Sequence, residues 1–117
     1  MNKRAKGTRY ESMAACYLEE KGYRILEQNF RCKQGEVDII AQDGKYLIFV
    51  EVKYRRNASH GYAVEAVLYK KQQNISRVAA FYLLRHGLSE DTPCRFDVIA
   101  IDGENIQHYE NAFEYCW

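Results

Sequence analysis

The sequence has no apolar run long enough to cross a membrane, because no window approaches the roughly 18 uninterrupted apolar residues that a transmembrane helix requires. It starts with the charged and polar segment MNKRAKGTRYES, and no apolar stretch of signal-peptide length follows. We therefore expect a soluble, cytoplasmic protein with no membrane partner.

Cysteine and histidine are scarce and scattered. The four cysteines form no CxxC pair, and none of the three histidines stands at zinc-finger spacing. A disulfide framework requires an extracellular location, which we do not expect here. We interpret the cysteines as reduced thiols and find no pattern for a zinc site.

An excess of charge of one sign is also missing, since 17 Lys and Arg stand against 16 Asp and Glu. This balance falls short of the basic excess that indicates nucleic-acid binding by itself. The distribution is uneven: residues 1–12 carry four basic residues and one acidic residue, residues 53–77 carry six and one, and residues 87–117 carry one and seven. Such polarity suits one face that meets a polyanion, although solvated charge runs are the commoner explanation.

What is present is ordinary for a globular chain: 117 residues, of which 47% are hydrophobic and 28% charged. There are no internal repeats, and the single proline is Pro93. This length supports one compact core and is too short for two, so we expect residues 1–117 to form one domain.

Periodicity and turn residues predict two helices and five strands. Thr8 and Glu11 have the form of a capping box and Gly22 supplies a stop, which predicts a helix over residues 9–21. An apolar stripe at helical spacing predicts a second helix over residues 64–86, ended by Gly87. The strands are expected at residues 24–31, 36–41, 46–54, 95–101 and 105–109, with no assignment for the last seven residues. The order predicts an α/β fold around one central mixed sheet flanked by helices.

The strand YLIFVEVKY, residues 46–54, ends in two charged residues on one face. Because side chains alternate along a strand, Glu51 and Lys53 share the face of Phe49. A two-residue turn at Asp43 and Gly44 would place Asp38 across from Phe49, and Glu36 across from Glu51. Asp38 and Glu51 would then be diagonal neighbours on the same face, with backbones roughly 7–8 Å apart, and Glu36, Asp38 and Ile40 would share that face.

The helices add two charged groups, each at the rim of a stripe that should pack on the sheet. Glu11 is in phase with Ala14, Ala15 and Leu18, and Lys71 is in phase with Ile75. Taken alone, Glu11 fits a capping partner of Thr8, and Lys71 fits a side chain that extends to water. Together, three acids on inward faces are costly unless they pair or bind a cation. Oxygen ligands favour a hard ion such as Mg²⁺ or Mn²⁺.

Other charged residues keep more than one interpretation. Asp97 fits either a buried pairing partner or a supporting group behind the acids. Glu36 fits either a spare ligand or a surface residue at the start of its strand. Arg55 and Arg56 are by default a solvated loop, and Asp43 and Asp102 are assigned to turns.

The ordered set of an acid on the opening helix, then GEVDIIA, an Asp-Gly hairpin and FVEVKYR, resembles the YraN-like bacterial family of predicted endonucleases. That family is placed in the PD-(D/E)xK nuclease superfamily, and the pattern is also similar to the archaeal Holliday junction resolvases. The resemblance covers nearly the whole chain and implies a restriction-endonuclease-like fold with an αβββαβ core. One departure is Val37, which stands where proline would precede Asp38.

The resemblance implies a role for each matching residue. Asp38 and Glu51 would bind Mg²⁺ or Mn²⁺ together with the backbone carbonyl of Val52, and Glu11 would hold a second ion or a coordinated water. Lys53 would orient or deprotonate the attacking water. The helix lysine, Lys71, would contact phosphate.

We therefore expect a metal-dependent endonuclease that hydrolyses phosphodiester bonds in DNA, with branched or junction DNA of repair or recombination as one substrate class. The alternative is a non-catalytic nucleic-acid-binding module that uses the same basic face. That face comprises Arg55, Arg56, Lys70, Lys71 and Arg77. A third hypothesis is an interaction subunit that uses the ten tyrosines. A symmetric homodimer is a further hypothesis, since a small chain would meet a two-strand substrate best in pairs.

Overall fold

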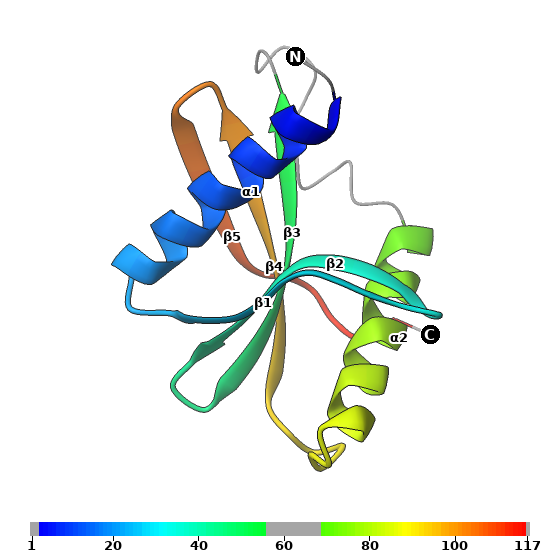
Figure 1. The fold of residues 1–117 in the computed structure, drawn as a ribbon. Helices are drawn as coiled ribbons and strands as arrows, with labels where there is room; N and C mark the ends of the chain where they lie inside the picture. The colour runs from blue at the N-terminus through cyan, green and yellow to red at the C-terminus, as the bar shows by residue number, and fades with distance from the viewer. Residues whose placement is uncertain (1–2, 56–68, 117) are drawn as a thin grey trace.

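The structure is a computed structural model that describes the backbone of residues 3–55 and 69–116. Its elements follow in the order α1 (Lys3–Glu20), β1 (Arg24–Cys32), β2 (Gly35–Asp43), β3 (Tyr46–Arg55), α2 (Tyr69–Arg85), β4 (Cys94–Asp102) and β5 (Asn105–Phe113). The five strands form one sheet in the order β1 to β5, in which β3 and β4 are parallel and the other neighbours antiparallel. The predicted α/β fold with a central mixed sheet is confirmed (Figure 1).

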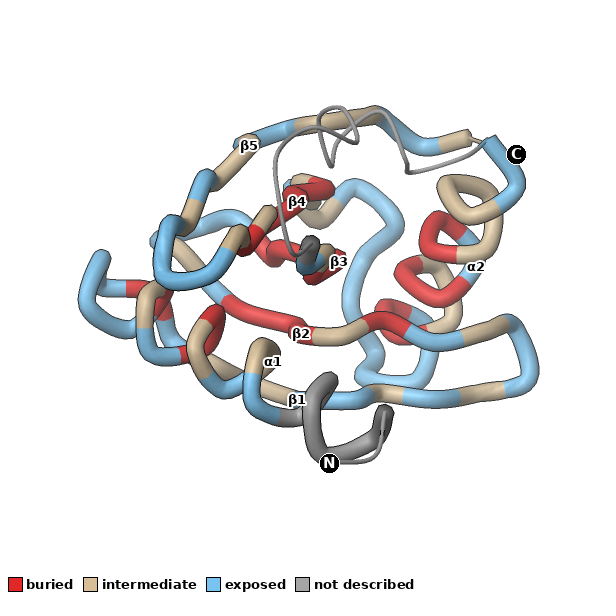
Figure 2. Tube along the Cα trace, turned by 90° about the horizontal axis from the view of Figure 1, so that it is seen from above, coloured by how far each residue is buried: buried red, intermediate tan, exposed pale blue. Residues whose placement is uncertain are grey.

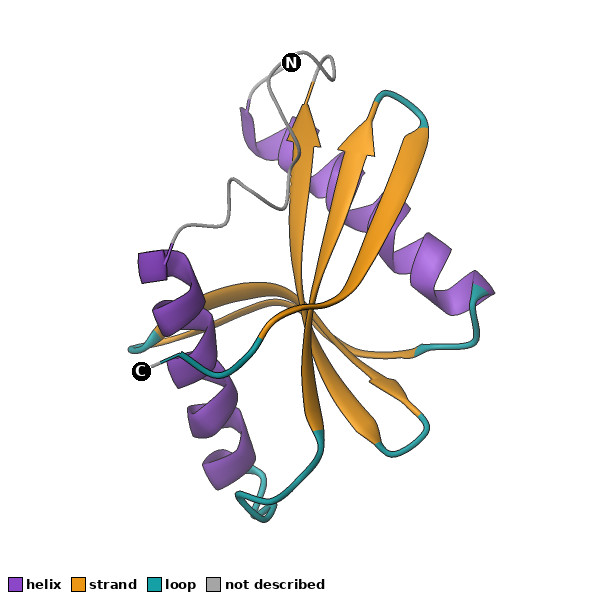
Figure 3. Ribbon diagram, turned by 180° about the vertical axis from the view of Figure 1, so that it is seen from behind, coloured by secondary structure: helices purple, strands orange, loops and turns teal. Residues whose placement is uncertain are grey.

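The two helices cover opposite faces of the twisted sheet (Figures 1 and 3). Alternate residues of β3 divide between two cores: Ile48 and Val50 pack under α1, whereas Leu47 and Phe49 pack under α2. The buried positions gather in the central strands and on the sides of the helices that face them (Figure 2). Each such side chain contributes about 1.5–3 kcal/mol on burial, so β3 is held firmly from both sides.

A glycine with positive φ ends each of the two helices. Gly22 has a φ of 93°, and the N–H groups of Gly22 and Tyr23 donate to the carbonyls of Glu19 and Leu18, which closes α1 with a Schellman motif. Gly87 ends α2 in the same way, as predicted. The capping-box prediction was wrong, because α1 begins at Lys3 and Thr8 lies inside it. The residues before Thr8 include helix-favouring lysine, arginine and alanine, which extend the helix backward. The predicted start of the second helix at residue 64 lies outside the described residues.

The turn between β2 and β3 differs from the predicted one. Asp43 pairs with Tyr46, so the two turn residues are Gly44 and Lys45. Gly44 has the positive φ, 58°, that this turn requires. The observed register places Ile40 opposite Phe49, where Asp38 was predicted. The displacement is even, so it leaves the faces of β3 unchanged.

The last strand is longer than predicted. β5 continues to Phe113, which pairs with Phe96 of β4 and stacks on it with ring centroids 5.2 Å apart. The pairing shifts near Asn111, whose φ is 52°. The chain thus resumes a strand after an irregular residue that the sequence pattern does not mark.

Two general expectations can be compared with the described part of the chain. Neither helix in residues 3–55 and 69–116 is both long and apolar enough to span a membrane. The four cysteines are all free, with Cys16 exposed and the other three half-buried. This agrees with their interpretation as thiols.

A buried ionic network joins β4 to β5. Asp97 is 0% exposed and accepts hydrogen bonds from Arg95 Nε and Nη2, each at 2.9 Å, and from the backbone N–H of Asn111 at 3.0 Å. The Nε2 atom of His108 lies 2.6 Å from its Oδ2. Burial alone would raise the pKa of Asp97, but the hydrogen bonds from His108 and Arg95 outweigh it and lower the pKa. Asp97 is therefore a buried pairing partner, as one of its two interpretations held.

We expect Asp97→Asn to destabilise the fold by about 3–5 kcal/mol, because it removes the buried carboxylate charge on which the hydrogen bonds of Arg95 and His108 converge. Urea unfolding at pH 7 measures this loss. The control is Glu36→Gln, which breaks an exposed ion pair with Arg31 at 3.1 Å and should change stability by about 0.5 kcal/mol or less. Equal effects of the two variants would show that the network contributes nothing beyond a surface pair.

Candidate functional site

The site forms where β2 separates from β3. The pairing of the two strands runs from Asp43 and Tyr46 to Ile39 and Val50. Beyond this point, the backbone N–H of Val52 donates to Asp38 Oδ2 at 2.7 Å. The carboxylate of Asp38 therefore replaces a backbone carbonyl of β2 as the acceptor. It satisfies the N–H of Val52, which the separation of the strands would otherwise leave without a partner on β2.

The path of β2 changes direction at Asp38. Val37 and Ile40 both pack in the core under α2, whereas Ile39 packs under α1. The prediction that Glu36, Asp38 and Ile40 share one face was therefore wrong, because the strand rotates between Val37 and Ile39. The β1–β2 hairpin bends away from the sheet at this point and its tip approaches α2 (Figure 1).

Glu51 is a buried carboxylate with an unsatisfied oxygen. Its residue is 6% exposed, and its Oε2 has no hydrogen-bond partner among the residues that the structure describes. The ammonium of Lys71 lies 3.6 Å from this oxygen, beyond hydrogen-bond distance. Burial, and then the charge and the hydrogen bond of Asp38, raise the pKa of Glu51 to about 8, although Lys71 and Lys53 act in the opposite direction.

Glu11 reaches the same cluster from α1. It is half-buried, and burial followed by the negative charge of Asp38 raises its pKa. The side chain of Asn29 on β1 forms a hydrogen bond with Glu11, which lowers the pKa in part. Glu11, Asp38 and Glu51 thus form one electrostatic cluster, drawn from a helix and two strands.

The structure also places the predicted basic residues. Lys53 is half-buried. The positive charges of Lys71 and Lys53 each lower the pKa of Glu51 in part. Lys70 and Arg77 are exposed, and their separation of seven residues puts them on one side of α2. The side chain of Arg55 and all of Arg56 lie outside the described residues.

Glu36, by contrast, is a surface residue. Its side chain is 54% exposed, and its Oε2 lies 3.1 Å from Arg31 Nε. It raises the pKa of Glu11 only as a lesser contribution, after burial and Asp38. This placement favours the surface interpretation of Glu36 over that of a spare ligand.

The donor set fits a hard divalent cation that keeps much of its water. Within residues 3–55 and 69–116, no three His, Cys, Asp or Glu side chains are grouped closely enough to hold a metal by themselves. Mg²⁺ is usually held by one or two carboxylates, waters and substrate phosphate. Asp38, Glu51 and the Val52 carbonyl would provide the protein ligands, and the Oε2 of Glu51 accepts no hydrogen bond from the described residues.

Asn29 is the site residue that the sequence reasoning missed. It has a φ of 54° in the middle of β1 and lies between the pairs Gln28–Ile39 and Phe30–Val37, opposite Asp38. Asparagine is depleted in strands and enriched in the left-handed region. An asparagine inside an otherwise strand-like segment was the available signal.

We expect Glu51→Gln to stabilise the fold at high pH in the presence of a chelator. The pKa of Glu51 rises from an ordinary 4.5 to about 8, so the folded state binds more protons between these values. Stability is therefore lost as the pH rises through this interval, and glutamine removes the loss. The gain should be on the order of 1–3 kcal/mol at pH 9 and absent near pH 4.

Urea unfolding of wild type and variant from pH 4 to 9 measures this difference, with Glu36→Gln as the exposed control. A variant that is no more stable than wild type at pH 9 would contradict the proton linkage of Glu51.

Comparisons with known proteins match most of the chain, including the acids of the cluster. The uncharacterised protein family UPF0102 matches residues 10–101, which include all three acids of the cluster. A UPF0102 protein of Lachnoclostridium phytofermentans is 49% identical over 114 residues, or 97% of each chain. One of Geobacter sulfurreducens is 51% identical over 116 residues, covering 95% of this chain and 90% of the relative. One of Legionella pneumophila is 39% identical over 111 residues, covering 93% and 94%. The chain belongs to the UPF0102 family.

Proposed function

We propose that this protein is a metal-dependent endonuclease of the PD-(D/E)xK superfamily that hydrolyses phosphodiester bonds in DNA. The observation that carries the proposal is the contact of two carboxylates where β2 leaves β3, with Glu51 buried and one of its oxygens unsatisfied. Perturbed acids with a specific charge partner are typical of functional sites. The lysines beside them supply the positive charge that a phosphodiester needs.

Asp38 and Lys53 would have different roles in this reaction. The N–H of Val52 holds the carboxylate of Asp38 through Oδ2, which would fix its orientation toward a cation. A bound Mg²⁺ or Mn²⁺ would acidify water and neutralise charge that develops on the phosphate. Lys53 would orient the attacking water by donating hydrogen bonds and would stabilise the negative phosphate oxygens.

The basic residues of α2 extend the site toward a polyanion. Lys71 stands 3.6 Å from Glu51 and is the cation nearest to the acids on this helix. Lys70 and Arg77 are exposed on α2 and would contact neighbouring phosphates. Such contacts position nucleic acid without reading its sequence, which fits recognition of DNA structure over base sequence.

Asp38→Asn should abolish metal-dependent cleavage, by at least about 100-fold, because it removes a ligand charge while asparagine can still accept from Val52 N–H. The measurement is a panel of branched, nicked and single-stranded DNA with Mg²⁺, Mn²⁺ or chelator. The control is Glu36→Gln, which removes a charge from the same strand and should leave cleavage unchanged.

The panel also separates the competing function. DNA binding without products in any metal would favour the non-catalytic binding module. Products that persist in chelator, or that Asp38→Asn forms as well as wild type, would exclude the proposed mechanism.

The role of Asn29 has a matched control in Asn111. Both residues have a positive φ, which glycine adopts freely, but only Asn29 hydrogen-bonds to Glu11 through its side chain, whereas Asn111 donates to Asp97 through its backbone. We expect Asn29→Gly to weaken Mn²⁺ binding by roughly 3- to 10-fold, the equivalent of one lost hydrogen bond.

Asn111→Gly should leave Mn²⁺ binding unchanged, because its backbone donor remains. Electron paramagnetic resonance titration of Mn²⁺ measures both, and urea unfolding shows whether the two variants differ in stability. Equal Mn²⁺ affinity in the two variants would show that Glu11 needs no support from Asn29.

A further inference from the structure

The tip of the β1–β2 hairpin lies against α2 (Figure 1). Phe30 of β1 packs on Phe81 and Tyr82 of α2, with ring centroids 6.5 Å and 5.5 Å apart. At the tip, a Cβ added to Gly35 would lie 3.5 Å from the Cβ of Asn74. The hairpin therefore follows α2 toward its N-terminal end.

Asn74 is surrounded by basic residues on the surface of α2. Lys70 and Lys71 precede it by four and three residues, and Arg77 follows it by three. Residues at these separations are neighbours on a helix, with Cβ atoms about 5–6 Å apart. The contact of Asn74 with the hairpin thus brings the hairpin turn beside three cations.

The turn itself carries a further cation, Lys33. It is exposed and stands first in the two-residue turn that joins β1 to β2. Arg31 on the same hairpin is paired with Glu36 at 3.1 Å, whereas Lys33 forms no ion pair with any residue that the structure describes. Cations gathered in this way repel one another unless an anion lies between them.

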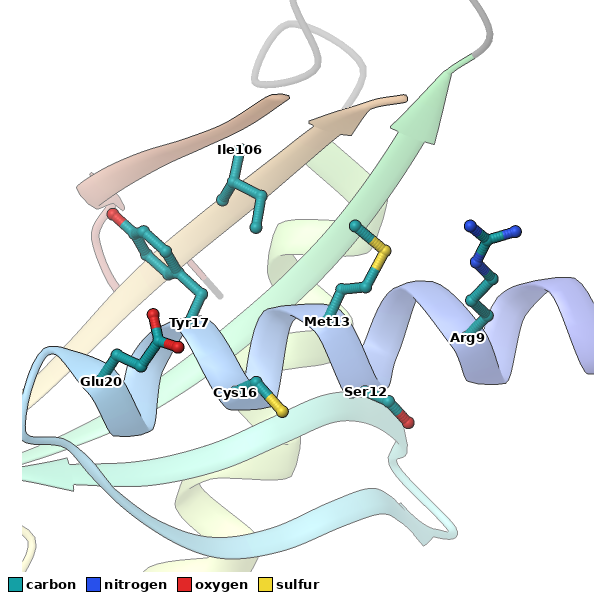
Figure 4. A pocket seen from close by; sticks show the side chains of 7 residues that line it. All are labelled: Arg9, Ser12, Met13, Cys16, Tyr17, Glu20 and Ile106. Carbon is teal, nitrogen blue, oxygen red and sulfur yellow. The ribbon is translucent and has the colours of Figure 1, made fainter. Parts of the chain in front are cut away.

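The described residues of α1 form a different kind of surface. Met13 and Tyr17, with Ile106 of β5, pack against the core. Arg9 at one end of the pocket that they line is offset by Glu20 at the other end (Figure 4). A polyanion would therefore find its cations on the α2 side of the sheet.

We propose that Lys33 binds a backbone phosphate of DNA, so that the hairpin tip and α2 hold the same polyanion from two sides. This inference rests on the proposed action on DNA. Contacts to phosphate position a nucleic acid without reading its bases, and each one releases counterions. The hairpin that provides Asp38 would thus also help to hold the substrate.

Lys33 is too far from the acids to take part in the reaction. Gly35 precedes Asp38 by three residues on β2, which corresponds to about 10 Å along a strand. Phosphates of one strand of duplex DNA recur about every 3.4 Å along its axis. Lys33 would therefore contact a phosphate roughly three or more nucleotides from the one that reacts, and would act on binding alone.

Lys45 is the matched control for Lys33. It is also an exposed lysine in a two-residue turn, the one that joins β2 to β3. The nine residues of β2 separate the two turns by roughly 25 Å along the strand. Loss of either lysine changes the net charge equally, so a difference between them reports the position of the charge.

Salt dependence of DNA binding tests the contact. Lys33→Gln should lower the slope of log binding constant against log salt concentration by about 0.9 and weaken binding roughly eightfold at about 0.1 M salt, the loss of one phosphate contact. Lys33→Arg keeps the charge and should bind like wild type, and Lys45→Gln should change neither quantity. The measurement is fluorescence anisotropy of labelled duplex DNA in chelator, over about 50–200 mM salt.

Three results would overturn the contact: a wild type that binds no DNA, an unchanged slope in Lys33→Gln, or an equal change in Lys45→Gln. Cleavage with Mn²⁺, measured separately, distinguishes this inference from the proposed function. A lowered slope in a protein that forms no products would support the contact and count against hydrolysis. Products together with an unchanged slope would exclude the contact and leave hydrolysis standing.

Discussion

The separation of β2 from β3 after Ile39 and Val50 is the constraint on which the candidate site depends. A strand that loses its neighbour leaves backbone donors exposed, and here Asp38 satisfies the N–H of Val52. This hydrogen bond holds the carboxylate of Asp38, from β2, against β3 and beside the carboxylate of Glu51. Burial, and then the charge of Asp38, raise the pKa of Glu51. The raised pKa of Glu51 thus follows in part from the separation of two strands, which brings Asp38 to it.

Two buried acids in the same sheet show how differently such groups can be treated. Asp97 receives hydrogen bonds from Arg95, His108 and the backbone, and its pKa is lowered. Glu51 has one oxygen that no described residue hydrogen-bonds, and its pKa is raised. The fold can therefore satisfy a buried acid fully where stability requires it. An acid left unsatisfied a short distance away represents a stability cost that a functional role would explain.

The order of elements, both glycine stops and the faces of β3 followed from periodicity and turn chemistry in the sequence. The turn was misplaced because Asp43 and Gly44 both tolerate a positive φ, yet the even displacement preserved the faces. The start of α1 was missed because a capping pattern competed with good helix formers before it. The rotation of β2 at Asp38 could not be predicted, since it depends on the hairpin packing against α2, where Gly35 lies beside Asn74.

Electrostatics also separates the two nucleic-acid hypotheses. A module that only binds phosphates gains from Lys53, Lys71 and the exposed basic residues of α2, but it loses from carboxylates placed among them. The negative charge of Asp38, which raises the pKa of both Glu51 and Glu11, reduces the positive field that a phosphate would meet. A divalent cation between acids and phosphate converts this repulsion into attraction. The placement of acids within a basic site is therefore unfavourable for simple binding and favourable for metal-assisted hydrolysis.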